Sequence, residues 1–352
     1  MTDPSSDQFV EMIPGLPEEI ALECLTRLHY SAQGIAFRVC KRWLRLLRSR
    51  EFYYHRRNSG QTRKVACLVQ ALPSPPLPSE SKKSAGPPSY GITVYDPISG
   101  AWDRIDPIPK FPDGLPLFCQ VVSTEGKLFV LGGWDPSSWE PVRDVFKFEF
   151  TTGRWTQCAD MPSTRSFFAV GAAEGRIFIA GGHDESKNAL SSAWVYDVEG
   201  NEWTELPRMK EERDECEGVV IGSGFWVVSG YDTESQGGFK SSAEVFDPAT
   251  GEWTRVEDAW RGTQCPRSCV SAAQNGQLTS WAECDSAVRV GTCGIDLGEV
   301  ALLTGSPYQG AAHGFFFVDK TEKTRGQNGK LNKMEVPESF SGFVQSGCFV
   351  EI

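Results

Sequence analysis

Hydrophobic residues follow two different patterns along this chain. Near the N-terminus, Ile20, Cys24 and Leu28 recur at the four-residue spacing that places side chains on one face of a helix. Beyond residue 64, short apolar runs are separated by glycine, asparagine and aspartate, which is typical of strands joined by tight turns. The patterns predict a small α-helical module over residues 11–57 and a mainly β domain over residues 65–352. We expect the polar residues 1–10 to be disordered.

The β domain carries a repeat with a period near fifty residues. An aromatic residue that closes one strand is followed by a tryptophan that opens the next, at Tyr95 and Trp102, Phe148 and Trp155, Tyr196 and Trp203, and Phe246 and Trp253. Both series advance by 53, 48 and 50 residues. Such a period is typical of a kelch-type β-propeller, in which each repeat forms one blade. We therefore expect these aromatic residues to be scaffold.

Three repeats are clearest, at residues 118–157, 166–205 and 215–255. Each contains a strand that ends in small residues, namely Gly132-Gly133, Gly181-Gly182 and Ser229-Gly230. We expect these strands to be innermost, where small residues let backbones crowd near the central axis. A later repeat is degenerate, because Ser280-Trp281 replaces the glycine pair. The pattern favours six blades, with five as the alternative, and a C-terminal strand that closes the ring on the first blade.

A proline- and serine-rich run covers residues 73–89 and predicts an irregular loop. The apolar strand before it, residues 65–72, and the strand after it, residues 91–96, fall within one repeat period. The run is therefore predicted to be an insertion inside the first blade rather than a linker between domains.

Charge is distributed unevenly over the chain, whose net charge is −11. Residues 38–64 carry ten basic residues and one acid, whereas residues 65–352 carry 24 basic and 39 acidic residues, a net of −15. An acidic domain repels phosphate, so we expect no nucleic-acid partner. The chain shows no apolar run long enough to cross a bilayer and no secretory pattern, so we expect no membrane partner, reduced cysteines, and a location in the cytoplasm and/or the nucleus.

The helical segment resembles an F-box. Leu-Pro near its start, spaced aliphatic residues and a Val-Cys-Lys-Arg-Trp block carry the resemblance through Leu16, Pro17, Ile20, Leu25, Leu28, Val39, Cys40 and Trp43. The resemblance implies that these residues bind a Skp-family adaptor and, through it, a cullin. Two or three short helices cannot enclose all of this apolar surface, which also indicates a partner. The alternative is a helical cap on a non-ligase kelch scaffold.

One face of the predicted propeller is rich in loops. In a four-stranded antiparallel blade, the connections between strands two and three and between successive blades open on the same face. Here those connections are long, so we expect target-binding residues there: Trp134, Trp139, Arg165, His183, Asp184, Lys187, Arg213, Tyr231, Phe239 and Arg267. The recurring Arg165, Arg213 and Arg267, with Asp135, Asp184 and Asp232, either grip a target or brace the blades.

Nothing in the sequence predicts catalysis, a metal or a cofactor. The four histidines are too few and too scattered for the copper site of kelch oxidases, and no nucleophile elbow or phosphate loop occurs. Cys265 and Cys269 lack a second ligand pair for zinc. Cys216 follows acidic residues that are expected to raise its pKa and disfavour a reactive thiolate. We therefore expect a non-catalytic protein.

An F-box followed by kelch repeats resembles the substrate receptors of SCF-type cullin-RING ubiquitin ligases. Four segments, 133–136, 165–169, 180–188 and 212–216, further resemble the plant KISS ME DEADLY group of kelch F-box proteins. That resemblance implies a receptor that delivers a target protein for ubiquitination and proteasomal degradation. It also implies two candidate targets, phenylalanine ammonia-lyase and type-B cytokinin response regulators.

Overall fold

The computed structural model describes residues 11–73, 88–261, 264–272, 277–320 and 331–352. The predicted disordered residues 1–10 and most of the proline-rich run therefore lie outside the described residues. Four short helices form the N-terminal module: α1 (Glu18–Thr26), α2 (Tyr30–Ala36), α3 (Lys41–Leu47) and α4 (Arg50–Asn58). Among the described residues, no helix is long and apolar enough to cross a membrane.

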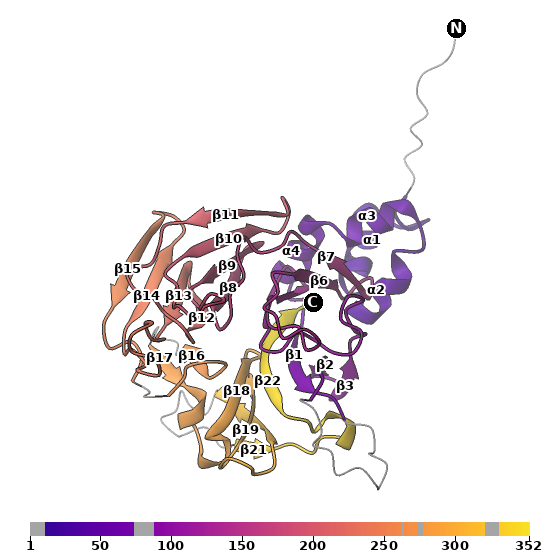
Figure 1. Ribbon diagram of the computed structural model, residues 1–352. Coiled ribbons are helices and arrows are strands. Elements are labelled where there is room, and N and C mark those ends of the chain that lie inside the picture. The colour runs from indigo at the N-terminus through magenta and orange to yellow at the C-terminus, as the bar shows by residue number, and fades with distance from the viewer. Residues whose placement is uncertain (1–10, 74–87, 262–263, 273–276, 321–330) are drawn as a thin grey trace.

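The remaining chain forms five four-stranded antiparallel sheets, and the chain is mainly β with an N-terminal helical module, as predicted (Figure 1). The first sheet is β22 (Val344–Glu351), β1 (Lys64–Ala71), β2 (Tyr90–Asp96) and β3 (Ala101–Arg104). The second is β4 (Gln120–Thr124), β5 (Lys127–Leu131), β6 (Val145–Glu149) and β7 (Arg154–Gln157). The third is β8 (Ala169–Ala173), β9 (Arg176–Ala180), β10 (Ala193–Asp197) and β11 (Glu202–Leu206).

The fourth sheet is β12 (Glu217–Ile221), β13 (Gly224–Val228), β14 (Ala243–Asp247) and β15 (Glu252–Val256). The fifth is β18 (Val290–Asp296), β19 (Val300–Ser306), β20 (Gly314–Asp319) and β21 (Leu331–Lys333). Between them lies a two-stranded sheet of β16 (Val270–Ala272) and β17 (Leu278–Ser280). Short 3-10 turns follow it: η1 (Trp281–Glu283) and η2 (Ser286–Val288), with η3 (Glu338–Phe340) placed before β22.

The blade number is five, the second of the two counts that the sequence allowed. The degenerate repeat forms only the two-stranded sheet β16–β17 within the described chain. The indole of Trp281, which replaces the glycine pair, is buried and packs directly on Gly294 of β18, where a Cβ atom would come within 2.1 Å of the ring. A bulky side chain therefore fills the space between the fourth and fifth complete blades.

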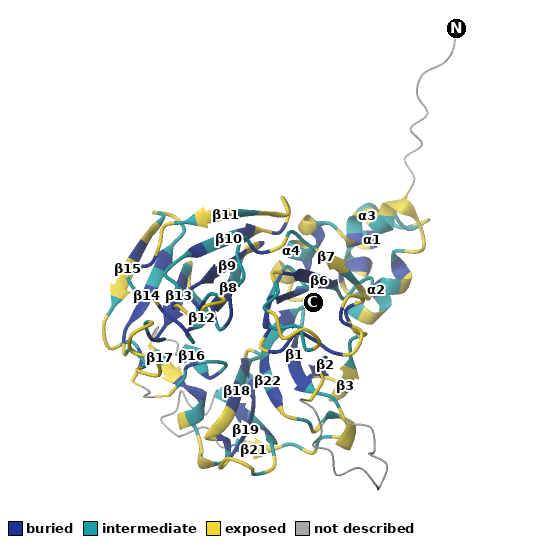
Figure 2. Ribbon diagram, viewed as in Figure 1, coloured by how far each residue is buried: buried dark blue, intermediate teal, exposed yellow. Residues whose placement is uncertain are grey.

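The C-terminal strand closes the ring, as predicted. β22 pairs antiparallel with β1 from Lys64 opposite Glu351 onward. β1 also pairs with β2, so both strands flanking the proline-rich run belong to one blade. Contacts between neighbouring blades run through β22, β4, β8 and β12, and the outermost strands β3, β7, β11 and β15 are mostly exposed (Figure 2).

The prediction that the glycine-pair strands are innermost is wrong, because they are the second strand of each blade. The second glycine of each pair (Gly133, Gly182 and Gly230) adopts positive φ and crowds against the loop that enters the same blade. A Cβ atom on Gly182 would lie 2.3 Å from Ser166 O, and one on Gly133 would lie 2.7 Å from Leu117 O. The small residues thus permit a close crossing of two loops rather than crowding at the axis.

The aromatic repeat residues join strands three and four and also join successive blades. Tyr196 lies directly opposite Trp203, with ring centroids 5.0 Å apart, and the other three pairs share this register. The indole Nε1 of Trp203 donates to Ala159 O of the preceding blade at 3.0 Å, and Trp155 and Trp253 make equivalent bonds to Asp106 O and Pro207 O. Each such tryptophan therefore ties its blade to the previous one.

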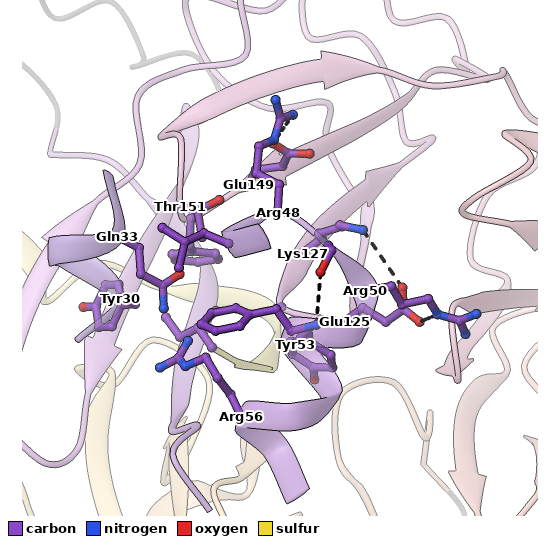
Figure 3. A pocket seen from close by; sticks show the side chains of 16 residues that line it. Tyr30, Gln33, Arg48, Arg50, Tyr53, Arg56, Glu125, Lys127, Glu149 and Thr151 are labelled. Atoms are coloured by element: carbon purple, nitrogen blue, oxygen red, sulfur yellow. Dashed lines mark hydrogen bonds and ion pairs between the residues drawn. The ribbon is translucent and has the colours of Figure 1, made fainter. Parts of the chain in front are cut away.

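The helical module packs on the face that carries the tight turns between strands, which we call the turn face (Figures 1 and 3). Arg50 contacts Glu125 through an Nε–Oε1 ion pair of 2.5 Å and donates to Glu174 O at 3.0 Å. Further ion pairs between the basic segment and the propeller are Arg48–Glu149, Arg57–Glu351 and Arg63–Asp96. The uneven charge of the chain thus becomes electrostatic complementarity within one molecule, and the module leaves the opposite face uncovered.

Candidate functional site

Three aliphatic side chains are exposed on the helical module. Ile20 of α1 is 51% exposed, Ile35 of α2 is 73% exposed, and Val39 in the turn before α3 is 62% exposed. Pro17 and Cys40, at the caps of α1 and α3, are also exposed. Aliphatic side chains with this exposure are accessible to a partner protein. We call Ile20, Ile35 and Val39 the module patch.

The other predicted adaptor-binding residues face the interior of the module. Leu25 is buried in the module core with Leu47 and Phe52, and Leu28 and Trp43 pack against that core. The indole Nε1 of Trp43 donates to Met12 O at 2.8 Å. Leu16 is half-buried. These residues therefore shape the module, and the patch itself is the surface available to a partner.

Two of the three recurring arginines are buried braces. Arg165 is 1% exposed and donates to Gly181 O and to Ser192 O, both at 3.2 Å. Burial lowers the pKa of its guanidinium to about 10. Arg213 is fully buried and contacts Glu244 through an Nε–Oε1 ion pair of 3.1 Å. This placement favours the bracing alternative for both.

Arg267 differs because it is shifted by one position relative to the strand that follows it. Arg165 and Arg213 precede the first residue of β8 and β12 by four positions, whereas Arg267 precedes that of β16 by three. Its half-buried guanidinium instead lies 4.4 Å from the ring centroid of Phe167 and 5.8 Å from that of Phe118. The shift turns this side chain from the blade interior toward the loop face.

The recurring aspartates hold their own loops. Asp135 accepts from Ser137 N at 2.7 Å, and Asp232 accepts from Ser235 N at 2.8 Å. Asp184 accepts from Ser186 N and Asn188 N, each at 2.9 Å, and hydrogen bonding to Asn188 lowers its pKa despite an opposing contribution from desolvation. These aspartates therefore act as local loop supports.

A ring of side chains surrounds the mouth of the propeller on the loop face. Isolated bridges pair Leu117 with Trp134, Ser166 with His183, and Asp214 with Tyr231. Each bridge joins a blade's entry loop to the residue just after the glycine-pair strand. The residue that follows the bridged residue of the entry loop adopts positive φ in each of these blades. These residues are Phe118 (59°), Phe167 (55°), Glu215 (50°) and, at the equivalent position of the degenerate repeat, Ser268 (57°). The repeat therefore sets equivalent backbone positions that carry different side chains.

Several predicted target-binding residues line one cleft of about 320 Å³ at this mouth. Its lining includes Trp134, Trp139, His183, Lys187 and Tyr231. Trp139 is 55% exposed, whereas Tyr231 is buried. Phe239 does not line the cleft but packs edge-on against Tyr231, with ring centroids 5.5 Å apart.

His183 places an unsatisfied nitrogen at this cleft. Its Nδ1 lies 2.9 Å from both carboxylate oxygens of Asp214. Its Nε2 is buried and has no hydrogen-bond partner among the described residues. Buried polar atoms are nearly always paired, so this nitrogen is an exception in the described chain.

Sequence reasoning missed several residues of both surfaces. It did not assign Ile35 to the adaptor site. It also missed Phe118, Phe167, Arg289 and Phe343, of which all but Phe167 line a second cleft beside the first. Alignment of the residues just before each blade's first strand would have found Phe118 and Phe167.

The three cysteines that the sequence singled out have raised pKa values. Burial raises the pKa of Cys216 to about 12, and burial does the same for Cys265 and Cys269. All three are therefore protonated near neutral pH. In the described part of the chain, no group of three or more His, Cys, Asp and Glu side chains could hold a metal ion.

Comparison with known proteins gives a consistent assignment. The family model for the KLHDC2/KLHL20/DRC7 Kelch-repeats domain matches residues 81–278. The chain is 40% identical to the Arabidopsis thaliana F-box/kelch-repeat protein At2g44130 over 79% of this chain and 73% of that protein. It is 36% identical to F-box/kelch-repeat protein At1g15670 and 37% identical to At1g80440, both from A. thaliana, over 97% of this chain and 100% of each relative.

These relatives match both the helical module and the propeller, because the last two alignments span nearly the whole chain. F-box/kelch-repeat proteins are typically non-catalytic adaptors. The chain belongs to the F-box/kelch-repeat proteins.

Proposed function

We propose that this protein is the substrate receptor of an SCF-type cullin-RING ubiquitin ligase. The module patch binds a Skp-family adaptor and thereby a cullin, and the loop face binds a target protein for ubiquitination and proteasomal degradation. The receptor itself performs no chemistry. It raises the concentration of target near the transferring enzyme.

The observation that carries this proposal is the exposure of Ile20, Ile35 and Val39 on a helical module whose other side is fixed to the propeller. A cap that served only the propeller would direct its apolar residues toward the propeller. Here the module contacts the propeller through the ion pairs of Arg48 and Arg50 and through the packing of Tyr30 on Phe150, and Ile20, Ile35 and Val39 point elsewhere. The aliphatic patch is left for another protein.

We further propose a location in the cytoplasm and/or the nucleus and two candidate targets. These are phenylalanine ammonia-lyase and the type-B cytokinin response regulators, which the resemblance of four loop-face segments to the KISS ME DEADLY group suggests. The alternative, a non-ligase kelch scaffold, shares the loop face but has no use for an adaptor. Adaptor binding therefore separates the two functions.

A reconstituted ligase tests the proposal. Full-length protein is combined with a Skp-family adaptor, a cullin–RING pair, a ubiquitin-conjugating enzyme and each candidate target. We expect ubiquitin conjugates on at least one target, and we expect none when Ile20, Ile35 and Val39 are all replaced by Asp. The matched control is Ile98→Asp with Tyr308→Asp, because these propeller residues are 71% and 67% exposed.

The outcomes separate the parts of the proposal. Failure of the wild-type chain to assemble with adaptor and cullin contradicts the receptor function and favours the scaffold. Assembly without conjugates on either candidate contradicts the target assignment alone. Equal activity of the Asp variant and wild type contradicts the role of the patch.

A further inference from the structure

A basic cleft interrupts the acidic propeller on its loop face. The cleft has a volume of about 430 Å³ and lies beside the first cleft, with which it shares Phe118. Arg267 and Arg289 line it, and none of its lining residues is an aspartate or a glutamate. In a domain of net charge −15, a cleft lined by two arginines and by no carboxylate is a basic patch on an acidic domain.

Neither guanidinium forms an ion pair with a residue of the described chain. Glu217 influences Arg267 electrostatically, but its carboxylate accepts hydrogen bonds from the backbone N–H groups of Ser268 and Gly218. Arg267 is instead stacked on Phe167 and Phe118, which leaves its hydrogen-bond donors available.

Exposed hydrophobic residues border the two arginines. Phe118 is 36% exposed, Val290 is 41% exposed and Phe343 is 43% exposed, and all three line the cleft. Apolar residues beside unpaired arginines are a typical composition for the centre of a protein interface.

The backbone holds these side chains in place. Phe118 and Phe167 both adopt left-handed φ, which L-residues with bulky side chains rarely adopt. The Phe118 N–H donates to Gln345 Oε1 at 3.2 Å. Phe343 lies over Gly291, where a Cβ atom would come within 2.8 Å of its ring, and its ring centroid is 5.1 Å from that of His313. The cleft is therefore built before any partner arrives.

We infer that this cleft binds an acidic segment of the target protein. Carboxylates of the segment pair with Arg267 and Arg289, and an adjacent apolar side chain packs on Phe118 and Phe343. The occupant is a protein segment rather than a nucleic acid, because a phosphate backbone leaving the cleft would cross an acidic domain. This inference rests on the proposed function, of which it specifies the target chemistry.

Selection from a random twelve-residue peptide display library on immobilised full-length protein tests the inference. We expect selected peptides to be enriched in Asp and Glu next to an aromatic or aliphatic residue. Their affinity, measured by fluorescence anisotropy, should fall roughly tenfold or more in Arg267→Ala/Arg289→Ala, since hydrogen bonds to charged groups are lost. The control is Arg154→Ala/Arg208→Ala, which removes the same charge from exposed arginines outside the cleft.

Selected peptides without acidic enrichment, or an equal loss in both double variants, would overturn the inference. So would a selection that yields no binding peptide. Substitution of a selected carboxylate by phosphoserine distinguishes carboxylate from phosphate recognition, and an absolute requirement for the phosphate would also contradict it. Adaptor binding is measured in parallel on the same variants, and we expect it to be unaffected. Failure of the peptide experiment therefore leaves the proposed receptor function standing, whereas failure of that function appears as loss of adaptor binding by the wild-type chain.

Discussion

The buried Arg213–Glu244 pair gives the sharpest test of whether the recurring arginines brace the blades. Both side chains are fully buried. Besides the ion pair, Arg213 donates to Ser229 O at 2.8 Å and to Ser242 O at 3.0 Å. Replacement by Met keeps much of the volume but leaves the Glu244 carboxylate buried without its counter-charge.

Removal of one partner of a buried ion pair costs about 3–5 kcal/mol of the free energy of unfolding. At about 2 °C per kcal/mol for a domain of this size, the Tm of Arg213→Met should fall by about 6–10 °C. The second substitution Glu244→Gln removes the stranded charge, so the double variant should recover at least about 1 kcal/mol. Thermal and urea unfolding, followed by circular dichroism, measure both effects.

Arg267→Met is the matched comparison, because Arg267 is half-buried and makes only cation–π contacts. Its loss should cost about 1 kcal/mol or less. If Arg213→Met were as stable as wild type while binding of selected peptides was lost, Arg213 would be a contact residue and the bracing role would be wrong. Equal destabilisation by the two arginine variants would contradict the distinction between them.

Three further predictions concern other parts of the fold. Gly182→Ala should destabilise the propeller more than Gly222→Ala in urea unfolding, since both glycines have positive φ but only Gly182 has backbone within 2.3 Å of the added Cβ; equal costs would contradict the close loop crossing. Arg48→Ala/Arg50→Ala should speed hydrogen exchange in α4, because it removes the ion pairs to Glu149 and Glu125, and unchanged exchange would show that these pairs do not hold the module. Burial lowers the pKa of His313 to about 4 from 6.5. The unfolded chain therefore binds a proton at this histidine first, and the free energy of unfolding should fall by up to about 3 kcal/mol as the pH drops from about 6.5 to about 4. His313→Gln should flatten this pH dependence, and an unchanged slope would contradict the prediction.

The repeat was predictable because its residues interact locally. Tyr196 and Trp203 face each other across one hairpin, so their seven-residue spacing recurs wherever the same hairpin forms. The closure of the ring by the C-terminal strand also followed from a general need to pair edge strands. These features depend on nearby sequence or on topology rules, and the sequence carries both.

Other features depend on long-range packing and were not predictable. The glycine-pair strand was wrongly expected to be innermost, because its small residues serve the contact of Gly182 with Ser166 O, which no local pattern reveals. The sequence left open whether the degenerate repeat forms a complete blade, because the packing of Trp281 on Gly294 joins positions that no local pattern connects. The choice of the turn face for the helical module depends on Arg50 meeting Glu125, two charges 75 residues apart.

The candidate site was predictable in position but not in detail. The loop face and Trp134, His183 and Tyr231 follow from the repeat, because these residues come directly after the second strand of each blade. An arginine that precedes the first strand of its blade by four residues, such as Arg213, is a buried brace. Arg267 precedes the following strand by three residues and lies near the surface. Side-chain direction in an irregular loop is set by such shifts and has no periodic signal.

Binding of a Skp-family adaptor to the purified full-length chain, measured by isothermal titration calorimetry, tests the central claim most directly. The module patch predicts one adaptor per chain. In the Ile20→Ala/Ile35→Ala/Val39→Ala variant the affinity should fall by roughly 2–4 kcal/mol, about 30-fold to 1000-fold, because the burial of these exposed side chains is lost. The variant should remain folded, since the three residues are not part of the module core. Absence of adaptor binding by the wild-type chain, or undiminished binding by this folded variant, would contradict the claim that the patch recruits the ligase.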